Sequence, residues 1–189
     1  WGLGHATRCI PIISELNKAQ ANVLIAASGS VKVLLQQEFP ENMFINLPSY
    51  NIRYTRNSRL LLWHLFLQVP RMVNTIVKEH RLVKKIVKKH SIDIIISDNR
   101  FGLFHSNLHT IYITHQLSFQ TGNAFFNFIA SKIHRWFIKR YTSCWVPDFE
   151  EQPIAGLLSH PPKPAGNIKY IGCLSRFEKM EEVEKKYDL

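Results

Sequence analysis

Residues 1–8 read Trp-Gly-Leu-Gly-His-Ala-Thr-Arg, and an apolar helical pattern follows them. Gly2 and Gly4 have no Cβ, so their backbone can take left-handed conformations and let a ligand approach closely. His5 then lies where a strand would pass into a helix, and an imidazole there can act as a base near neutral pH. The same residues also fit a glycine-rich turn with an incidental histidine, and both interpretations stay open.

Short apolar runs alternate with helical patterns along the chain. We expect strands at 22–27, 43–47, 92–97, 110–114, 144–146 and 169–171, and helices at 7–20, 31–38, 59–69, 71–90 and 123–141. Pro11 fits the first helix only in its first turn, and Pro70 is expected to separate two helices. The run at 92–97 is typical of a strand buried on both faces. This alternation predicts an α/β fold, with a parallel sheet covered by helices on both faces.

In such a sheet, ligands bind at the carboxyl ends of the strands. The polar residues expected along this edge are His5, Asp98, Asn99, His115, Gln116 and Asp148. Asp98 is either a functional carboxylate or the N-cap of a following helix, where Asp is favoured. His115 either contacts a substrate or satisfies a buried backbone group. Arg8 either contacts a phosphate, which we favour, or pairs with a carboxylate.

The charge of the chain favours anionic partners. Lys and Arg number 24 and Asp and Glu 14, giving a formal net charge of +10, which suits phosphate groups, nucleic acid or an anionic membrane surface. The three cysteines have neither metal-site nor disulfide spacing, so we predict no metal and a reducing, cytoplasmic environment. No apolar run reaches the roughly 18 residues that span a bilayer, so any membrane contact is expected to be peripheral.

Two segments could make that contact. Basic residues at 78–90 form either a solvated helix face or a binding surface. The apolar run at 60–66 and a group of aromatic residues are either core or, with flanking lysines, a surface for an anionic membrane and a lipid-linked acceptor. The aromatic residues are Phe125, Phe126, Phe128, Trp136 and Phe137.

Six segments together resemble the amino-terminal half of bacterial glycosyltransferases of the GT-B architecture, a group related to the UDP-N-acetylglucosamine transferase of peptidoglycan synthesis. The segments are Gly2–Arg8, Ser97–Arg100, Thr114–Gln116, Cys144–Asp148, Leu158–Pro161 and Tyr170–Gly172. The resemblance spans nearly the whole chain. It implies a Rossmann-like domain that binds the acceptor and faces a second domain that holds the nucleotide sugar.

The resemblance also implies how the chain is organised. Residues 1–175 would form the acceptor domain and residues 176–189 a charged linker toward an absent donor-binding domain. We further expect that the first strand of the sheet is missing before Trp1, and that this fragment alone is inactive.

The resemblance implies a mechanism as well. Related enzymes of the plant and antibiotic type use a histidine after the first strand as general base, supported by an aspartate about a hundred residues later, and His5 and Asp98 match these places. A hydroxyl acceptor, a carbohydrate or a lipid-linked molecule, would then attack the anomeric carbon of a UDP-sugar with inversion, without a cofactor or metal. The predicted substrate-binding residues are Gly2, Gly4, Arg8, Asn99, Arg100, His115 and Gln116.

Two other functions stay open. A UDP-sugar epimerase has the same two-domain architecture, and fold does not settle function. A non-enzymatic basic module for membranes or nucleic acid is compatible with the charge, but the chain has no recognisable motif for RNA or DNA, so nucleic acid is not expected as a partner. We expect a cytoplasmic protein, or one peripheral on the inner face of the inner membrane.

Overall fold

The computed structural model describes residues 3–52, 61–162 and 167–177. Gly2 and most of the expected linker at 176–189 lie outside these residues, so the predicted division into domain and linker stays a prediction. The elements are α1 (Leu3–Lys18), β1 (Leu24–Ala27), α2 (Gly29–Glu38), β2 (Met43–Asn46), α3 (Leu61–His90), β3 (Ile94–Asp98), β4 (His109–Ile113), α4 (Ala124–Ile138), β5 (Ser143–Val146), the short 3-10 helix η2 (Gly156–Leu158) and β6 (Ile168–Tyr170).

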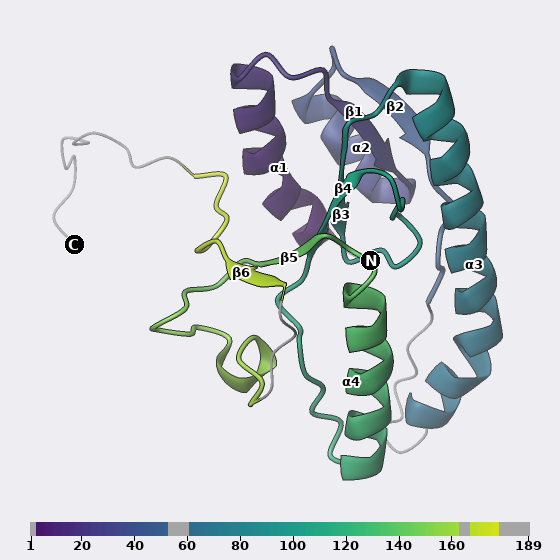
Figure 1. Ribbon diagram of the computed structural model, residues 1–189, viewed down its shortest axis with the longest axis vertical. Helices are drawn as coiled ribbons and strands as arrows, with labels where there is room; N and C mark the ends of the chain where they lie inside the picture. The colour runs from purple at the N-terminus through teal and green to yellow at the C-terminus, as the bar shows by residue number, and fades with distance from the viewer. Residues whose placement is uncertain (1–2, 53–60, 163–166, 178–189) are drawn as a thin grey trace, which may run out of the picture.

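Every strand pair is parallel. Strands β1 and β2 form a two-stranded sheet, and β3 to β6 form a four-stranded sheet in the order β3-β4-β5-β6. Figure 1 shows α1 and α3 on opposite sides of the strands. The prediction of an α/β fold with parallel strands and surrounding helices is therefore confirmed.

Three apolar clusters hold these layers together. One joins α1 and α2 to β1 through residues such as Ile10, Ile25 and Leu35. Another joins α3 to the loop after β3 through Val83 and Leu103. The third surrounds β4 and β5 and consists of Tyr112, Leu117, Ile138, Tyr141, Cys144 and Val146. The apolar faces that the sequence pattern predicts pack against one another in these clusters. This packing brings the start of α1 close to the carboxyl ends of β3 and β4.

Both prolines depart from the expectation. Pro11 lies in the middle of α1 and Pro70 lies inside α3, which runs unbroken from Leu61 to His90. A proline removes a helix hydrogen bond and crowds the carbonyl four residues earlier. In α1, burial of Ile10 and Ile13 offsets this cost. In α3, the exposed Pro70 faces solvent, where the displaced carbonyl can tilt toward water.

Strand β3 also differs from the expectation of burial on both faces. Ile94 is 54% exposed, because β3 is the edge strand of the four-stranded sheet. Its carboxyl end is better protected, since Ser97 is fully buried. Among the described helices, none is both long enough and apolar enough to cross a bilayer.

Candidate functional site

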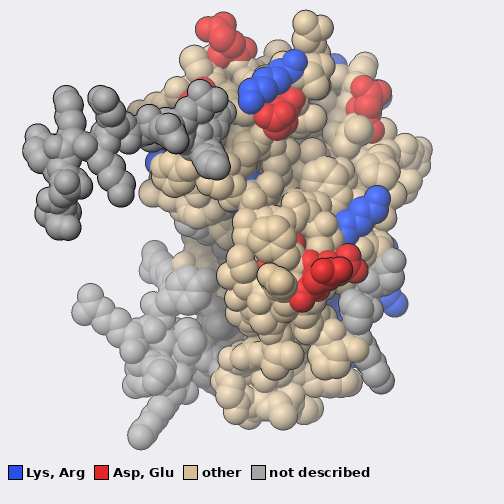
Figure 2. All heavy atoms as spheres, turned by 90° about the vertical axis from the view of Figure 1, so that its left-hand side faces the viewer, with Lys and Arg blue, Asp and Glu red and all other residues tan. Residues whose placement is uncertain are grey.

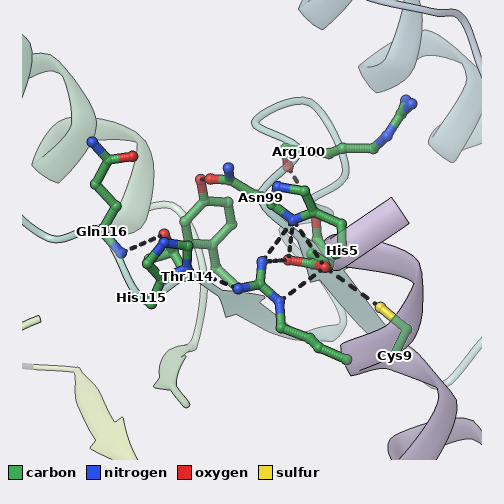
Figure 3. A network of polar contacts seen from close by, with 12 residues as sticks. His5, Cys9, Asn99, Arg100, Thr114, His115 and Gln116 are labelled. Carbon is green, nitrogen blue, oxygen red and sulfur yellow. Dashed lines mark hydrogen bonds and ion pairs between the residues drawn. The ribbon is translucent and has the colours of Figure 1, made fainter. Parts of the chain in front are cut away.

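A polar cluster joins the first turn of α1 to the carboxyl end of β3. His5 Nδ1 lies 3.2 Å from both carboxylate oxygens of Asp98, although the two residues are 93 positions apart. The helix places His5 on the face that packs against the sheet, next to the buried Ala6. Asp98 is the last residue of β3. Figure 3 shows the His5 side chain within this network of polar contacts.

Arg8 lies one helical turn after His5 and connects the cluster. Its Nε donates to Asp98 Oδ2 at 3.1 Å and its Nη2 donates to Asp98 Oδ1. Its Nη1 lies 2.9 Å from Nδ1 of His115, which follows β4. The favoured expectation that Arg8 contacts a phosphate is therefore replaced by the alternative, a carboxylate pair, because the spacing of three residues puts Arg8 on the same face of α1 as His5.

The surroundings of Asp98 and His115 decide which of the two side chains is charged at neutral pH. Burial acts to raise the pKa of Asp98, but hydrogen bonds from His5 and Arg8 and the charge of Arg8 outweigh it and hold that pKa below its ordinary value. Partial burial of its ring first, and then the charge of Arg8, lower the pKa of His115. At neutral pH Asp98 is therefore an anion and His115 is neutral, so His115 Nδ1 accepts a hydrogen bond from Arg8. Burial raises the pKa of the Cys9 thiol, which lies 3.5 Å from Asp98 Oδ2.

His5 Nδ1 has two competing partners, and its tautomer decides between them. When Nδ1 carries the proton, it donates to Asp98 and Nε2 is a proton acceptor. When Nδ1 is bare, it accepts from Arg8 Nη2, which lies 2.7 Å away, and Nε2 carries the proton. Because an arginine can only donate, the ionised Asp98 is the group that favours the tautomer with a basic Nε2.

The cluster remains accessible at its rim. The His5 side chain is 25% exposed, whereas those of Arg8 and Asp98 are 12% and 10% exposed. His115 is exposed as well, so it does not satisfy a buried backbone group. A molecule in solution can thus reach the imidazoles while the ion pair behind them stays largely covered.

Two sequence interpretations are wrong at this point. No helix follows Asp98 before β4 begins at His109, so Asp98 is not an N-cap. Gly4 lies inside α1 without a left-handed backbone, and a Cβ there would meet nothing within 4 Å. Gly4 is therefore part of the start of the helix rather than of a left-handed turn, and Gly2 lies outside the described residues.

Arg100, expected at the substrate, contributes to a different cluster. Its Nη1 donates to Glu79 Oε1 at 2.6 Å and to the Pro48 carbonyl at 3.1 Å, and its Nη2 donates to Ser28 Oγ at 2.8 Å. Figure 3 shows its side chain extending away from His5. Arg100 is thus engaged by the protein and does not join the cluster of His5 and Asp98, and its predicted contact with a substrate stays a prediction.

Glu79 is the residue that sequence reasoning missed. Its side chain is fully buried in α3 and accepts hydrogen bonds from Tyr50 Oη at 2.6 Å and from the Gly102 N–H at 3.2 Å. Burial raises its pKa, although Tyr50 and Arg100 act to lower it. One signal was available, because Glu79 is the sole acidic residue in the sequence of α3.

The remaining predicted residues lie near the cluster without joining it. Asn99 has a positive φ of 51° and its Oδ1 accepts from Tyr112 Oη at 2.8 Å. The Gln116 N–H donates to Thr114 Oγ1 at 3.1 Å, and its side chain points away from His5 in Figure 3. Their predicted contacts with a substrate stay predictions.

Asp148, also expected at the strand edge, is satisfied within its own loop. Its Oδ1 accepts from the N–H groups of Phe149 and Ile154, and its Oδ2 accepts from the N–H of Ala155 and from Ser159 Oγ. Burial opposes ionisation, but these four hydrogen bonds lower the pKa of Asp148 strongly. This carboxylate organises the loop after β5 and is not open to a ligand. No group of three or more potential metal ligands occurs among the described residues.

Comparison with known proteins bears on the fold. A crystal structure of UDP-N-acetylglucosamine 2-epimerase superposes with a TM-score of 0.50 at 16% sequence identity, covering 87% of this chain and 42% of that one. The two share a Rossmann-like fold. This chain spans less than half the length of that protein. No family model matches the sequence, and no curated protein matches it.

Proposed function

We propose that this chain is the acceptor-side half of a glycosyltransferase that moves a sugar from a UDP-linked donor to a hydroxyl group, with inversion at the anomeric carbon. The observation that carries the proposal is the contact of His5 Nδ1 with both oxygens of Asp98. This pair lies at the carboxyl end of a parallel strand, where open α/β sheets bind their ligands.

In this mechanism His5 is the general base. A hydroxyl is a poor nucleophile at neutral pH, and a positioned base accelerates its attack by about a hundred- to ten-thousand-fold. His5 Nε2 takes the hydroxyl proton as the oxygen forms a bond to the anomeric carbon, and the bond from that carbon to the UDP phosphate breaks. The sugar is transferred and UDP leaves with the electron pair of the broken bond.

Asp98 and Arg8 act as positioning residues. The anionic Asp98 accepts the Nδ1 proton of His5, selects the tautomer with a basic Nε2 and stabilises the imidazolium that forms. Arg8 fixes the carboxylate through two donors, which a planar guanidinium does better than a lysine. The second domain, which would bind most of the UDP-sugar, stays a prediction.

A UDP-sugar epimerase is the second candidate, supported by the fold shared with UDP-N-acetylglucosamine 2-epimerase. The two activities differ in their need for an acceptor. The test uses the protein together with the predicted donor-binding domain. It incubates this protein with UDP-sugars, with and without a panel of hydroxyl acceptors, and follows UDP release and the configuration of the sugar. Transfer predicts a new glycoside and UDP only when an acceptor is present, whereas epimerisation with donor alone would contradict the proposal.

A further inference from the structure

The turn that follows β3 has a backbone conformation that side chains rarely adopt. Asn99 has a φ of 51°, in the left-handed region, where a residue with a Cβ is strained. Such strain persists only where the surrounding structure holds it in place. Because Asn99 comes directly after Asp98, the contacts that hold Asn99 also set the direction of the Asp98 carboxylate.

Tyr112 holds Asn99 from the neighbouring strand. Its Oη donates to Asn99 Oδ1 at 2.8 Å, and the Asn99 N–H donates to the Ile113 carbonyl at 3.0 Å. Tyr112 and Ile113 are consecutive residues of β4, and both are fully buried. Asn99 is therefore attached to β4 through its side chain and through its backbone. Figure 3 shows Asn99 in the same network of polar contacts as His5.

His134 of α4 decides where the Tyr112 hydroxyl donates its proton. The His134 Nε2 lies 3.3 Å from Tyr112 Oη, while its Nδ1 is buried and has no hydrogen-bond partner among the described residues. Burial lowers the pKa of His134, so the ring is neutral at pH 7 and carries one proton. A buried N–H without an acceptor is the costlier arrangement, so this proton lies on Nε2 and is donated to Tyr112. The Tyr112 hydroxyl then donates its own proton to Asn99.

Two further hydroxyls hold the next residue of the turn. The Arg100 carbonyl accepts from Ser97 Oγ at 2.7 Å and from Tyr141 Oη at 2.7 Å. Ser97 and Tyr141 are buried as well. Buried polar networks whose members are satisfied rigidify the local structure. The two residues after Asp98 are thus fixed by buried side chains.

The position of Asp98 matters because its contact with His5 has a competitor. Both carboxylate oxygens lie 3.2 Å from His5 Nδ1, at the long end of the range for N–H···O hydrogen bonds. Arg8 Nη2 lies closer to the same nitrogen, at 2.7 Å. Figure 2 shows acidic side chains in separate groups at the surface, whereas the Asp98 side chain is 10% exposed, so its protein contacts determine where it lies. A small displacement of this carboxylate would let Nδ1 accept from Arg8 instead, and the basic Nε2 would be lost.

We propose that Tyr112 is a positioning residue for the reaction of His5. Its hydroxyl holds the Asn99 side chain, the turn keeps the Asp98 carboxylate on His5 Nδ1, and His5 Nε2 stays basic. This inference rests on the proposed function, because it assigns a residue that supports the same catalytic pair. Tyr112 is fully buried and touches no substrate, so its effect on transfer must pass through Asn99 and Asp98.

The first experiment needs no substrate. Nitrogen chemical shifts of the ¹⁵N-labelled chain report which ring nitrogen of His5 carries the proton. Tyr112→Phe removes only the hydroxyl and should lower the ratio of the Nδ1–H to the Nε2–H tautomer by about three- to tenfold, the factor for one neutral hydrogen bond. Asn99→Gly keeps the left-handed backbone without the amide and should have the same effect. The matched control is Tyr170→Phe, whose lost hydroxyl donates to the Ser159 carbonyl at 3.1 Å, and it should leave the ratio unchanged.

The second experiment measures transfer in the protein that includes the predicted donor-binding domain. Tyr112→Phe should lower kcat by about three- to tenfold and leave KM unchanged, because a buried hydroxyl makes no contact with the substrate. Added to Asp98→Asn, it should cause no further loss, since the hydroxyl acts through that carboxylate.

Four outcomes would overturn the proposal. These are an unchanged tautomer ratio in either Tyr112→Phe or Asn99→Gly, an equal change in Tyr170→Phe, a raised KM with unchanged kcat in Tyr112→Phe, or a further loss of transfer when Tyr112→Phe is added to Asp98→Asn. The failure of the proposed function would look different. A tautomer ratio that changes as expected in a protein that transfers no sugar would support the role of Tyr112 and contradict the glycosyltransferase.

Discussion

Two arginine–carboxylate pairs flank the end of β3, and they differ in what surrounds them. Asp98 pairs with Arg8 beside His5 and His115, and the His5 side chain is 25% exposed. Glu79 pairs with Arg100 beside Tyr50 and a backbone amide, and the Glu79 side chain is fully buried. The first pair places groups that can move a proton where a ligand can reach them. The second fixes α3 against the loop after β3, so it serves the architecture.

The largest loss of folding stability is expected when the Glu79 side chain is removed. Glu79→Ala should lower the free energy of unfolding by about 3–5 kcal/mol, because it leaves the Arg100 charge buried without its partner. Asp98→Asn should cost less, about 1–2 kcal/mol, because the asparagine Oδ1 can still accept a hydrogen bond from Arg8. Urea unfolding of the two variants measures both values, and equal losses would remove the distinction between the pairs.

His134 is a buried histidine that takes no part in the cluster of His5, Arg8 and Asp98. Burial lowers its pKa to about 4, from an ordinary value of 6.5. Below pH 6.5 the unfolded chain binds a proton that folded His134 does not, so its contribution to stability is complete above about pH 6.5 and is lost as the pH falls to about 4. A phenylalanine does not titrate, so His134→Phe removes this loss of stability at low pH.

The stability of wild type relative to His134→Phe should therefore fall by about 3 kcal/mol between pH 7 and pH 4. Urea unfolding at a series of pH values measures the difference, which cancels the contributions of other groups. A difference that is independent of pH would show that His134 titrates normally.

One glycine lies beside each of the two arginine–carboxylate pairs, and the space around the two glycines differs. A Cβ on Gly102 would lie 2.5 Å from both Glu79 Cβ and the Ile76 carbonyl oxygen. Gly102→Ala should therefore push the loop away from α3 and cost about 1–3 kcal/mol of stability. The readout is the free energy of unfolding, and a cost below a few tenths of a kcal/mol would mean that the loop moves freely there.

Gly4 is the matched control beside the Asp98–Arg8 pair, and the smallest effect is expected there. Because a Cβ there meets nothing within 4 Å, Gly4→Ala should stabilise α1 by about 0.5 kcal/mol. Thermal unfolding measures this gain. If a substrate approaches Gly4 closely, the same variant should raise KM, and an unchanged KM would remove Gly4 from the substrate contacts.

Much of this organisation could be predicted from local pattern. The apolar runs and the polar residues that end them indicated the strands and the meeting of His5 with Asp98, because parallel strands present their carboxyl ends at one edge. Other features depend on tertiary contacts that spacing does not encode. The pairing of Arg100 with Glu79 is set by how α3 crosses the loop after β3, and helix continuity through Pro70 depends on its exposure.

The central claim is that His5 and Asp98 act as one catalytic unit. A double-mutant cycle on kcat/KM for transfer, measured in the protein that includes the predicted donor-binding domain, with His5→Ala, Asp98→Asn and their combination, tests it most directly. We predict that each single substitution lowers kcat/KM by about a hundredfold or more, and that the double variant is scarcely worse than His5→Ala alone. Turnover within about threefold of wild type in both single variants, or losses that multiply in the double variant, would contradict it.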